Sequence, residues 1–285
     1  MNLVRSIGVT LLLMTVGTFP VIADEERAVP LEGVLNTRDL GGLKTEDGRV
    51  VRAGQLIRSG EIDEISERSK QRLDDMGVSA IVDLRTTSEA TAHPAQWPEG
   101  EGPKRHNFPV MESESQMIED MRASIKSGTA TAEGTDALFA GAFGYIATDY
   151  TDEYRDLFDV LLGQPEGEAV LFHCSGGKDR TGVATALVLT ALGVTKEDIQ
   201  ADFMMSNVLK DADNKAEQIA AEVNAAYGTN MTAAAVWPSL GVRDSYLDEF
   251  YNSVEKSYGS VEGYLREGLG LTDEDLDSLR NRYLQ

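Results

Sequence analysis

The chain has 285 residues, and its 26 basic and 48 acidic residues give a formal net charge of −22. So acidic a chain is repelled at long range by nucleic acid and by anionic membranes, which excludes a nucleic-acid partner and requires any phosphate affinity to be local. It has one cysteine, Cys174, which excludes an intramolecular disulfide, so that a hydrophobic core must supply the stability.

Residues 1–23 have the pattern of a secretory signal peptide. Arg5 provides the positive charge, an apolar stretch follows, and Ala23 provides the small residue before the expected cleavage. The alternative is a membrane anchor, but the stretch is broken by Gly17 and Pro20 and is shorter than the ~20 residues of a spanning helix. We predict cleavage after Ala23, a secreted or periplasmic protein without a stable membrane anchor, and one domain over residues 24–285.

The next segments predict alternating strands and helices. Glu46-Asp47-Gly48 predicts a hairpin turn, residues 64–76 have helical spacing, and 79–84 form an apolar strand pattern. A further strand is expected over 104–110. This βαβ order predicts an α/β fold with a central, mostly parallel sheet flanked by helices.

Residues 111–140 are polar and lack a strand pattern, so we predict helical elements inserted between a strand and the next core helix. Residues 142–162 predict that helix. Its aromatic side chains are expected in the core rather than against a substrate: Tyr145, Tyr150 and Tyr154.

The segment 169–192 predicts the functional site. Residues 169–172 are short and apolar, as in a buried parallel strand, and Thr181 to Leu192 are apolar and long enough for a buried helix. Between them lies a glycine-containing loop, Cys174-Ser175-Gly176-Gly177-Lys178-Asp179-Arg180. A strand, such a loop and a helix N-terminus together turn successive backbone N–H groups toward a bound phosphate.

The residue types of this loop suit nucleophilic attack on phosphorus. A helix N-terminus and nearby cations lower the pKa of a thiol to about 3.5–7.5, which favours the thiolate of Cys174. Arg180 offers a planar fork for two phosphoryl oxygens, and Lys178 adds a second cation. Ser175, Gly176 and Gly177 are the predicted substrate-binding backbone, since glycine lets the chain approach closely.

Two neighbours of the loop have supporting roles. The Thr181 hydroxyl at the helix start would hydrogen-bond the sulfur of Cys174 as it leaves, and His173 would orient the loop from behind. The alternative for any single cysteine is a small buried hydrophobe, but here the whole surrounding pattern favours catalysis.

Beyond the loop, the pattern is helical. Gly193 predicts a helix C-cap, Thr195-Lys196-Glu197-Asp198 a capping box, and 211–228 a helix. Thr272 caps a last helix that ends near Leu284.

At His173-Cys174 and Gly177-Lys178-Asp179-Arg180-Thr181-Gly182, the chain resembles the cysteine-dependent phosphatases of the protein tyrosine phosphatase superfamily. The closing Gly-Lys-Asp-Arg-Thr-Gly is similar to a bacterial secreted branch with tyrosine and phosphoinositide activity. Three further stretches resemble that branch: residues 36–42, residues 58–60 with 83–85, and residues 258–271. The resemblance implies a mobile lid in 111–140; the alternative is a plain surface helix with a loose linker.

Several residues are candidates for the proton donor to the leaving group, because the Trp-Pro-Asp loop of the wider superfamily is absent. Glu99, in Trp97-Pro98-Glu99, precedes the strand at 104–110 instead of following it, and after that strand no carboxylate occurs before Glu112. Asp83 ends a predicted central strand, where ligand crevices form, or it pairs with an arginine. The cations beside Asp179 favour its ionised form, but a bound phosphate dianion opposes them, and the resemblance implies Asp179 as the acid.

These patterns predict a phosphate monoester hydrolase that acts through a phosphocysteine on phosphotyrosine proteins, with possible dual specificity. The alternatives are a phosphoinositide phosphatase, a non-catalytic phosphate-binding module and a redox sensor built on Cys174. Arg38, Arg58 and Arg85 are further candidate phosphate cations, although Arg38 and Asp39 are more often fold-holding ion pairs. No cofactor or metal is predicted, since His93, His106 and His173 have no ligand spacing.

Overall fold

The sheet has five strands in the computed structural model, which describes residues 27–95, 97 and 102–285. The strands are β1 (Arg38–Asp39), β2 (Leu56–Ser59), β3 (Val78–Asp83), β4 (Lys104–Asn107) and β5 (Ala169–His173). Their order is β1-β2-β5-β3-β4. All neighbours are parallel except β1, which runs antiparallel to β2. The predicted α/β fold with a mostly parallel sheet is confirmed.

Strand β5 occupies the centre of the sheet, and all of its residues are buried there. Phe172 pairs with Arg58 of β2 on one side and with Val82 of β3 on the other. The residues that follow β5 therefore emerge at the carboxyl edge of a parallel sheet, where ligand crevices form.

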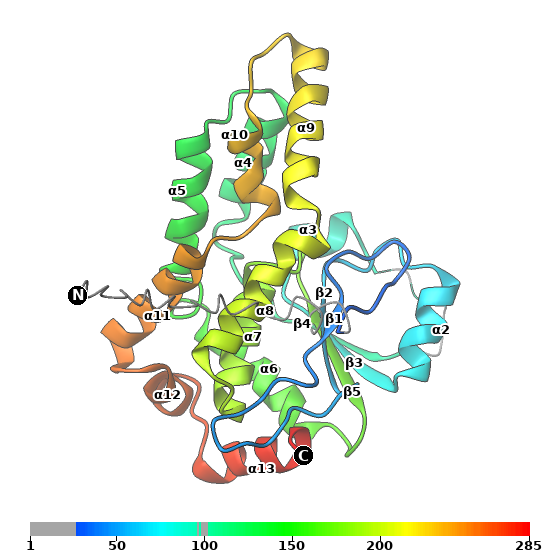
Figure 1. The fold of residues 1–285 in the computed structure, drawn as a ribbon, viewed down its shortest axis with the longest axis vertical. Coiled ribbons are helices and arrows are strands. Elements are labelled where there is room, and N and C mark those ends of the chain that lie inside the picture. The colour runs from blue at the N-terminus through cyan, green and yellow to red at the C-terminus, as the bar shows by residue number, and fades with distance from the viewer. Residues whose placement is uncertain (1–26, 96, 98–101) are drawn as a thin grey trace, which may run out of the picture.

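Helices cover both faces of the sheet (Figure 1). In chain order, they are α2 (Glu67–Asp75), α3 (Thr87–Ala92), α4 (Ser115–Lys126), α5 (Ala132–Phe143), α6 (Thr151–Gly163), α7 (Arg180–Leu192), α8 (Lys196–Leu209), α9 (Ala212–Tyr227), α10 (Ala233–Leu240), α11 (Asp244–Tyr258), α12 (Val261–Gly263), the π-helical η1 (Tyr264–Gly268) and α13 (Asp273–Tyr283).

Successive side chains of each strand point to opposite faces of the sheet, so they pack in two hydrophobic layers, one on each face. Ile57, Ile81 and Leu171 pack with Leu73 of α2 on one face. Val82 and Phe172 belong to the larger core on the other face, where the middle and C-terminal helices pack.

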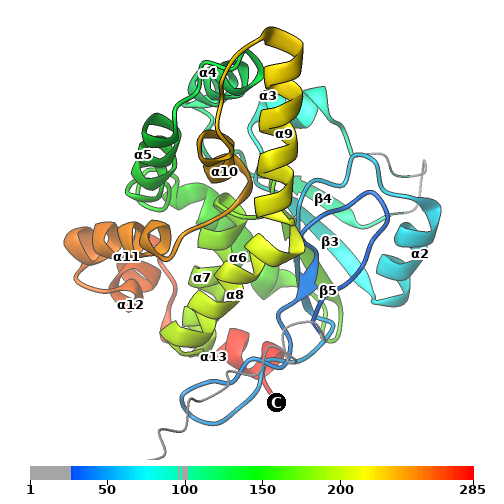
Figure 2. The same ribbon diagram turned by 45° about the horizontal axis from the view of Figure 1, so that its top comes forward.

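Four helices, α4, α5, α9 and α10, rise beyond the end of the sheet in both views (Figures 1 and 2). Helix α10 packs against α5 and α9. Helices α4, α9 and α10 share a small apolar core that includes Ile125, Ala220 and Val236, whereas the buried apolar side chains of α5 belong to the larger core. The predicted helical insertion at 111–140 forms α4 and most of α5 in this group.

The continuous helix predicted over 142–162 is wrong. Helix α5 ends at Phe143, a turn follows in which the Gly144 N–H donates to Gly141, and α6 begins at Thr151. Glycine is a poor helix former, so the chain turns here at little cost. Tyr150 and Tyr154 are buried in the core as expected, and Tyr145 is partly buried.

Most of the shorter sequence signals are confirmed. Residues 46–48 form the hairpin turn, Gly193 ends α7 with a φ of +85°, and Thr272 forms a full capping box with Asp275. Thr195 only accepts the Asp198 N–H, without the reciprocal bond. None of the helices within the described ranges is long and apolar enough to cross a bilayer.

Candidate active site

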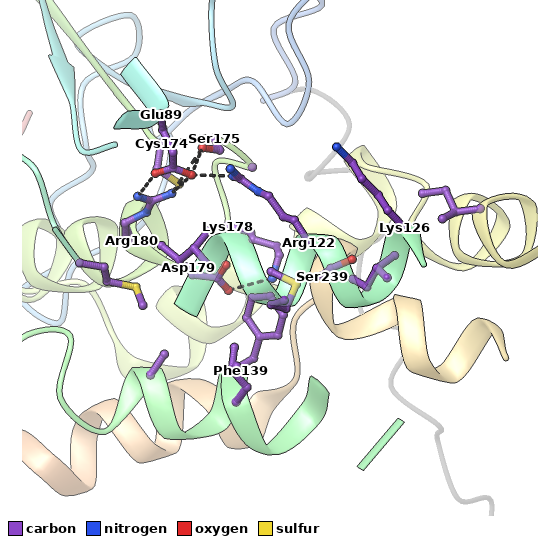
Figure 3. Close-up of a pocket in the computed structure, with 18 residues that line it drawn as sticks. Glu89, Arg122, Lys126, Phe139, Cys174, Ser175, Lys178, Asp179, Arg180 and Ser239 are labelled. Carbon is purple, nitrogen blue, oxygen red and sulfur yellow. Dashed lines mark hydrogen bonds and ion pairs between the residues drawn. The ribbon is translucent and has the colours of Figure 1, made fainter. Parts of the chain in front are cut away.

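The loop between β5 and α7 forms the floor of a cavity of about 360 Å³. Cys174 lies directly after β5 and is only 2 % exposed. Ser175, Gly176, Lys178 and Arg180 line the cavity with it (Figure 3). The structure therefore brings together, in one cavity, most of the loop residues that the sequence singled out.

The walls of the cavity are largely apolar and come mostly from the four helices that rise beyond the sheet, together with Glu89 of α3 and Met111. Helix α4 also contributes two cations, Arg122 and Lys126. The other wall residues are Glu89, Met111, Ile118, Met121, Ile125, Leu138, Phe139, Ala142, Ile219 and Ser239. Residues 111–140 thus line the cavity, and their movement as a lid stays a prediction.

Glu89 of α3 holds the guanidinium of Arg180 in a two-point ion pair. The Arg180 nitrogens donate to its Oε2 at 2.6 Å and its Oε1 at 3.2 Å. Burial opposes charge on Arg180, but the attraction of Cys174 and Glu89 outweighs it and raises the pKa of Arg180. The arginine is therefore charged and fixed in one orientation beside the sulfur.

Glu89 is the centre of a wider network. Its Oε1 also accepts from the Ser175 hydroxyl at 2.7 Å and from Arg122 at 2.6 Å. Burial favours its neutral form, yet these partners, Arg180 above all, hold the pKa of Glu89 well below its usual range. Sequence reasoning missed Glu89, because Thr86 and Glu89 have the spacing of a capping box and do form one.

Lys178 and Asp179 lie side by side in the cavity floor. The Lys178 ammonium donates to the Asp179 carboxylate at 2.9 Å and to the Pro238 carbonyl at 2.9 Å. It also lies 4.1 Å from the centre of the Phe139 ring. Asp179 makes no capping bond to the helix that follows it, so that its carboxylate stays available to the cavity.

The back of the loop is fixed through its carbonyl groups. Asn36 donates to the Gly177 carbonyl at 2.8 Å, and Arg58 donates to the same oxygen at 2.8 Å. Asp202 of α8 forms ion pairs with Arg58 and Arg38, all of them buried. These contacts occupy the Gly177 carbonyl group with donors that do not line the cavity, and we therefore expect the loop N–H groups to be the ones that meet a ligand.

Gly177 is the one loop position where a side chain has no room. Its φ is +63°, and a Cβ built there would lie 2.3 Å from the Ser59 carbonyl oxygen. Only glycine combines this backbone conformation with this approach.

Thr181 and His173 are both buried next to Cys174. The Thr181 hydroxyl has no hydrogen-bond partner among the described residues, and the structure shows no bond from it to the sulfur. His173 Nδ1 lies 3.3 Å from the Cys174 carbonyl, and burial lowers the pKa of His173, which favours neutral imidazole.

Asp83 and Arg38 lie outside the Cys174 cavity. Arg85 donates to Asp83 at 2.8 Å. Burial raises the pKa of Asp83, but the nearby His173 and the hydrogen bonds and charge of Arg85 outweigh burial and lower it. Arg38 is fully buried against Asp202, and Asp39 accepts from the backbone N–H groups of two loops. Both acids and both arginines thus hold the fold, and none of them lines the cavity.

Of the remaining acid candidates, the structure describes only Glu112, which does not line the cavity. Glu112 follows β4 but accepts the Thr87 N–H at 2.7 Å and is exposed. Glu99 lies outside the described residues. In the described part of the chain, no group of three or more His, Cys, Asp or Glu side chains is placed to hold a metal ion.

A family model described as the tyrosine phosphatase family matches residues 29–285. The chain belongs to this family. It is a phosphatase, a phosphoric monoester hydrolase.

Three related proteins match this chain over most of its length. A protein of Cupriavidus necator, named provisionally as a tyrosine-protein phosphatase, is 34 % identical over 254 residues, which cover 88 % of this chain and 86 % of that protein. The triple specificity protein phosphatase PtpB of Mycobacterium tuberculosis is 28 % identical over 273 residues, 88 % of this chain and 96 % of the relative. A tyrosine-protein phosphatase of Nostoc commune is 24 % identical, over 81 % of this chain and 74 % of its own.

Proposed function

We propose that this tyrosine phosphatase family member hydrolyses phosphotyrosine in proteins through a phosphocysteine intermediate. The main support for this proposal is the position of Cys174, which is 2 % exposed and lies at the floor of a cavity with largely apolar walls. A long aromatic side chain can bury its ring against these walls while its phosphate meets the loop. A short phosphoserine has no ring to offer them, so dual specificity would be weaker.

The first step is attack by the Cys174 thiolate on phosphorus. The S–P bond forms as the P–O bond to the leaving group breaks, and the loop N–H groups and Arg180 bind the charge on the phosphoryl oxygens. Asp179 gives its proton to the leaving oxygen. Water then attacks phosphorus, passes its proton to the Asp179 carboxylate, and the S–P bond breaks to release phosphate.

The role of Asp179 as acid is supported by its place in the cavity floor. A bound phosphate dianion puts negative charge beside its carboxylate and also competes for Lys178, and both effects favour the protonated form. The segment after β4 reaches the cavity at Met111 without a carboxylate there.

The test of the nucleophile is the Cys174→Ser variant with p-nitrophenyl phosphate. We expect turnover to disappear while inorganic phosphate still binds, because the loop N–H groups and Arg180 remain. Turnover retained in this variant would exclude the phosphocysteine.

The test of the acid compares leaving groups. Asp179→Asn should slow phenyl phosphate more than p-nitrophenyl phosphate, whose leaving group scarcely needs a proton. Glu112→Gln is the matched control and should treat both substrates as the unmodified enzyme does. Equal slowing of both substrates by Asp179→Asn would place the acid elsewhere.

A second candidate substrate is a phosphoinositide. Arg122, Lys126 and Lys178 add cations to the cavity beyond Arg180, which suits a polyphosphorylated ring, whereas the acidic surface opposes docking on anionic membranes. A panel of phosphotyrosine, phosphoserine and phosphothreonine peptides and soluble inositol phosphates separates these cases. A preference for inositol phosphates over phosphotyrosine peptides would show that a phosphoinositide, and not phosphotyrosine, is the substrate.

We also propose export, supported by the signal-peptide pattern of residues 1–23. Expression of the full chain in a bacterium, followed by fractionation and N-terminal sequencing, should find a protein that begins at Asp24 outside the cytoplasm. An unprocessed chain in the cytoplasm would contradict this.

A further inference from the structure

Helix α8 presents one face to the phosphate-binding loop. Asp202, Ser206 and Lys210 are spaced by four residues, so they lie above one another on a helix. Asp202 pairs with the arginines behind the loop, and Ser206 lies 3.3 Å from the Asn36 amide that also holds the loop. Lys210, the last of the three and the C-cap of α8, reaches the loop at Gly176.

The Lys210 side chain is largely buried beside the loop, and its ammonium forms no ion pair with the described residues. The residue is 7 % exposed, and its Nζ lies 3.5 Å from the position that a Cβ on Gly176 would occupy. Within the described residues, this Nζ has no hydrogen bond and no ion pair, although the chain has 48 acidic residues. An unpaired buried charge is costly, so a fold that keeps one beside a phosphate-binding loop has a use for it.

The surrounding charges agree with this description. Burial and the positive charge of Lys178 lower the pKa of Lys210 to about 8, while Cys174 and Asp179 oppose that shift. The ammonium is therefore still largely charged at neutral pH, and an incoming anion would be its first strong partner.

The other two cations of the loop already have partners. Arg180 is held by Glu89, and Lys178 by Asp179 and the Pro238 carbonyl. Lys210 differs from both, because Cys174 and Asp179 attract its charge without forming an ion pair or hydrogen bond with its ammonium in the described residues. Gly176 lines the cavity, so an ester seated on the loop passes close to this ammonium.

We propose that Lys210 is a substrate-binding residue whose ammonium binds the phosphate ester held on the loop at Cys174–Asp179. This inference rests on the proposed function, since it needs a loop that binds phosphate monoesters. It adds a third cation from α8, outside the sequence segment that carries the motif.

The test measures binding of inorganic phosphate by calorimetry, with Cys174→Ser as the common background so that no turnover occurs. We expect Lys210→Met to weaken phosphate binding about tenfold. Lys210→Arg, which keeps the charge, should stay within about threefold of the background. The control is Lys44→Met, an exposed lysine that does not line the cavity, which should leave the affinity unchanged.

Thermal unfolding separates binding from a structural role. Because Lys210→Met removes a buried charge that lacks a partner, its melting temperature should equal or exceed that of the background. A lower melting temperature together with weaker binding that arginine fails to restore would show a structural residue and overturn the proposal. Unchanged phosphate affinity in Lys210→Met would overturn it as well.

The two proposals fail in different ways. If the proposed function is wrong, the Cys174→Ser variant still turns over p-nitrophenyl phosphate, or the unmodified chain does not hydrolyse phosphotyrosine peptides. If only the Lys210 inference is wrong, the unmodified chain is active and the phosphate affinity does not respond to Lys210→Met.

Discussion

Replacing Glu89 by Gln tests whether the network around Arg180 holds the active site together. The carboxylate accepts hydrogen bonds from Arg180, Arg122 and Ser175 within 3.2 Å, and it is 95 % buried. An amide of the same shape keeps one acceptor oxygen but turns an NH₂ group toward donors. The change therefore leaves a buried guanidinium without its counter-charge.

The expected size follows from that loss. Removing one partner of a buried ion pair costs about 3–5 kcal/mol, and the remaining acceptor places Glu89→Gln near the lower end. For a domain of this size, 1 kcal/mol shifts the melting temperature by about 2–4 °C, so we expect a fall of about 6–12 °C. Loss of one oriented donor to the transition state lowers kcat by about 100-fold.

The assay is thermal unfolding by circular dichroism, with kcat and KM for p-nitrophenyl phosphate on the same preparations. Glu112→Gln is the control, because this exposed carboxylate holds only a backbone N–H; its melting temperature should change by less than about 2 °C. A decrease in the melting temperature of Glu89→Gln by less than about 2 °C, together with a kcat within about twofold of the unmodified enzyme, would refute the reasoning.

The pH dependence gives a second reading of the same network. The pKa of Glu89 is held below its ordinary value, so its contribution to stability is complete above about pH 5 and is lost progressively at lower pH, where the unfolded chain takes up the proton before the folded form does. The difference in melting temperature between the two proteins should stay constant from pH 6 to 8. It should narrow below about pH 4.

The other predictions concern the support of the loop and the core. Gly177→Ala should lower the free energy of unfolding by about 2–5 kcal/mol and abolish most of the activity, because its backbone is left-handed and the new Cβ would overlap a carbonyl oxygen. The control is Gly167→Ala, where φ is +85° and the space is open. In the same urea titration it should lower the free energy of unfolding by only about 1 kcal/mol. Asp202→Asn should lower the free energy of unfolding by about 3–5 kcal/mol and reduce kcat, because Arg38 and Arg58 behind the loop would then repel one another without a counter-charge. An unchanged free energy of unfolding would mean that these ion pairs do not stabilise the fold. Tyr264→Phe should cost about 1 kcal/mol with unchanged KM, because its hydroxyl donates to the Ala147 carbonyl far from the cavity; a change in KM would contradict this.

The local patterns predicted much of the fold. The apolar run at 169–172 became the central strand, and the helix after it begins at Arg180, one residue before the prediction. Strands β1 and β2 were not predicted, because β1 has two residues and β2 carries the charge of Arg58. Arg58 is tolerated in the middle of the sheet only because Asp202, 144 positions away in the chain, neutralises it.

The sequence alone determined the make-up of the loop and predicted its chemistry, because Cys174, the glycines and Arg180 lie in one contiguous segment whose spacing reports directly on one strand, one turn and one helix. The tertiary structure decided which distant side chains serve that loop. Glu89 reaches Arg180 from another helix, Asn36 and Arg58 hold the loop from behind, and Lys210 approaches it from α8. Such contacts join residues with no fixed spacing along the chain, and they exist only once packing of the sheet and helices brings the side chains within bonding distance.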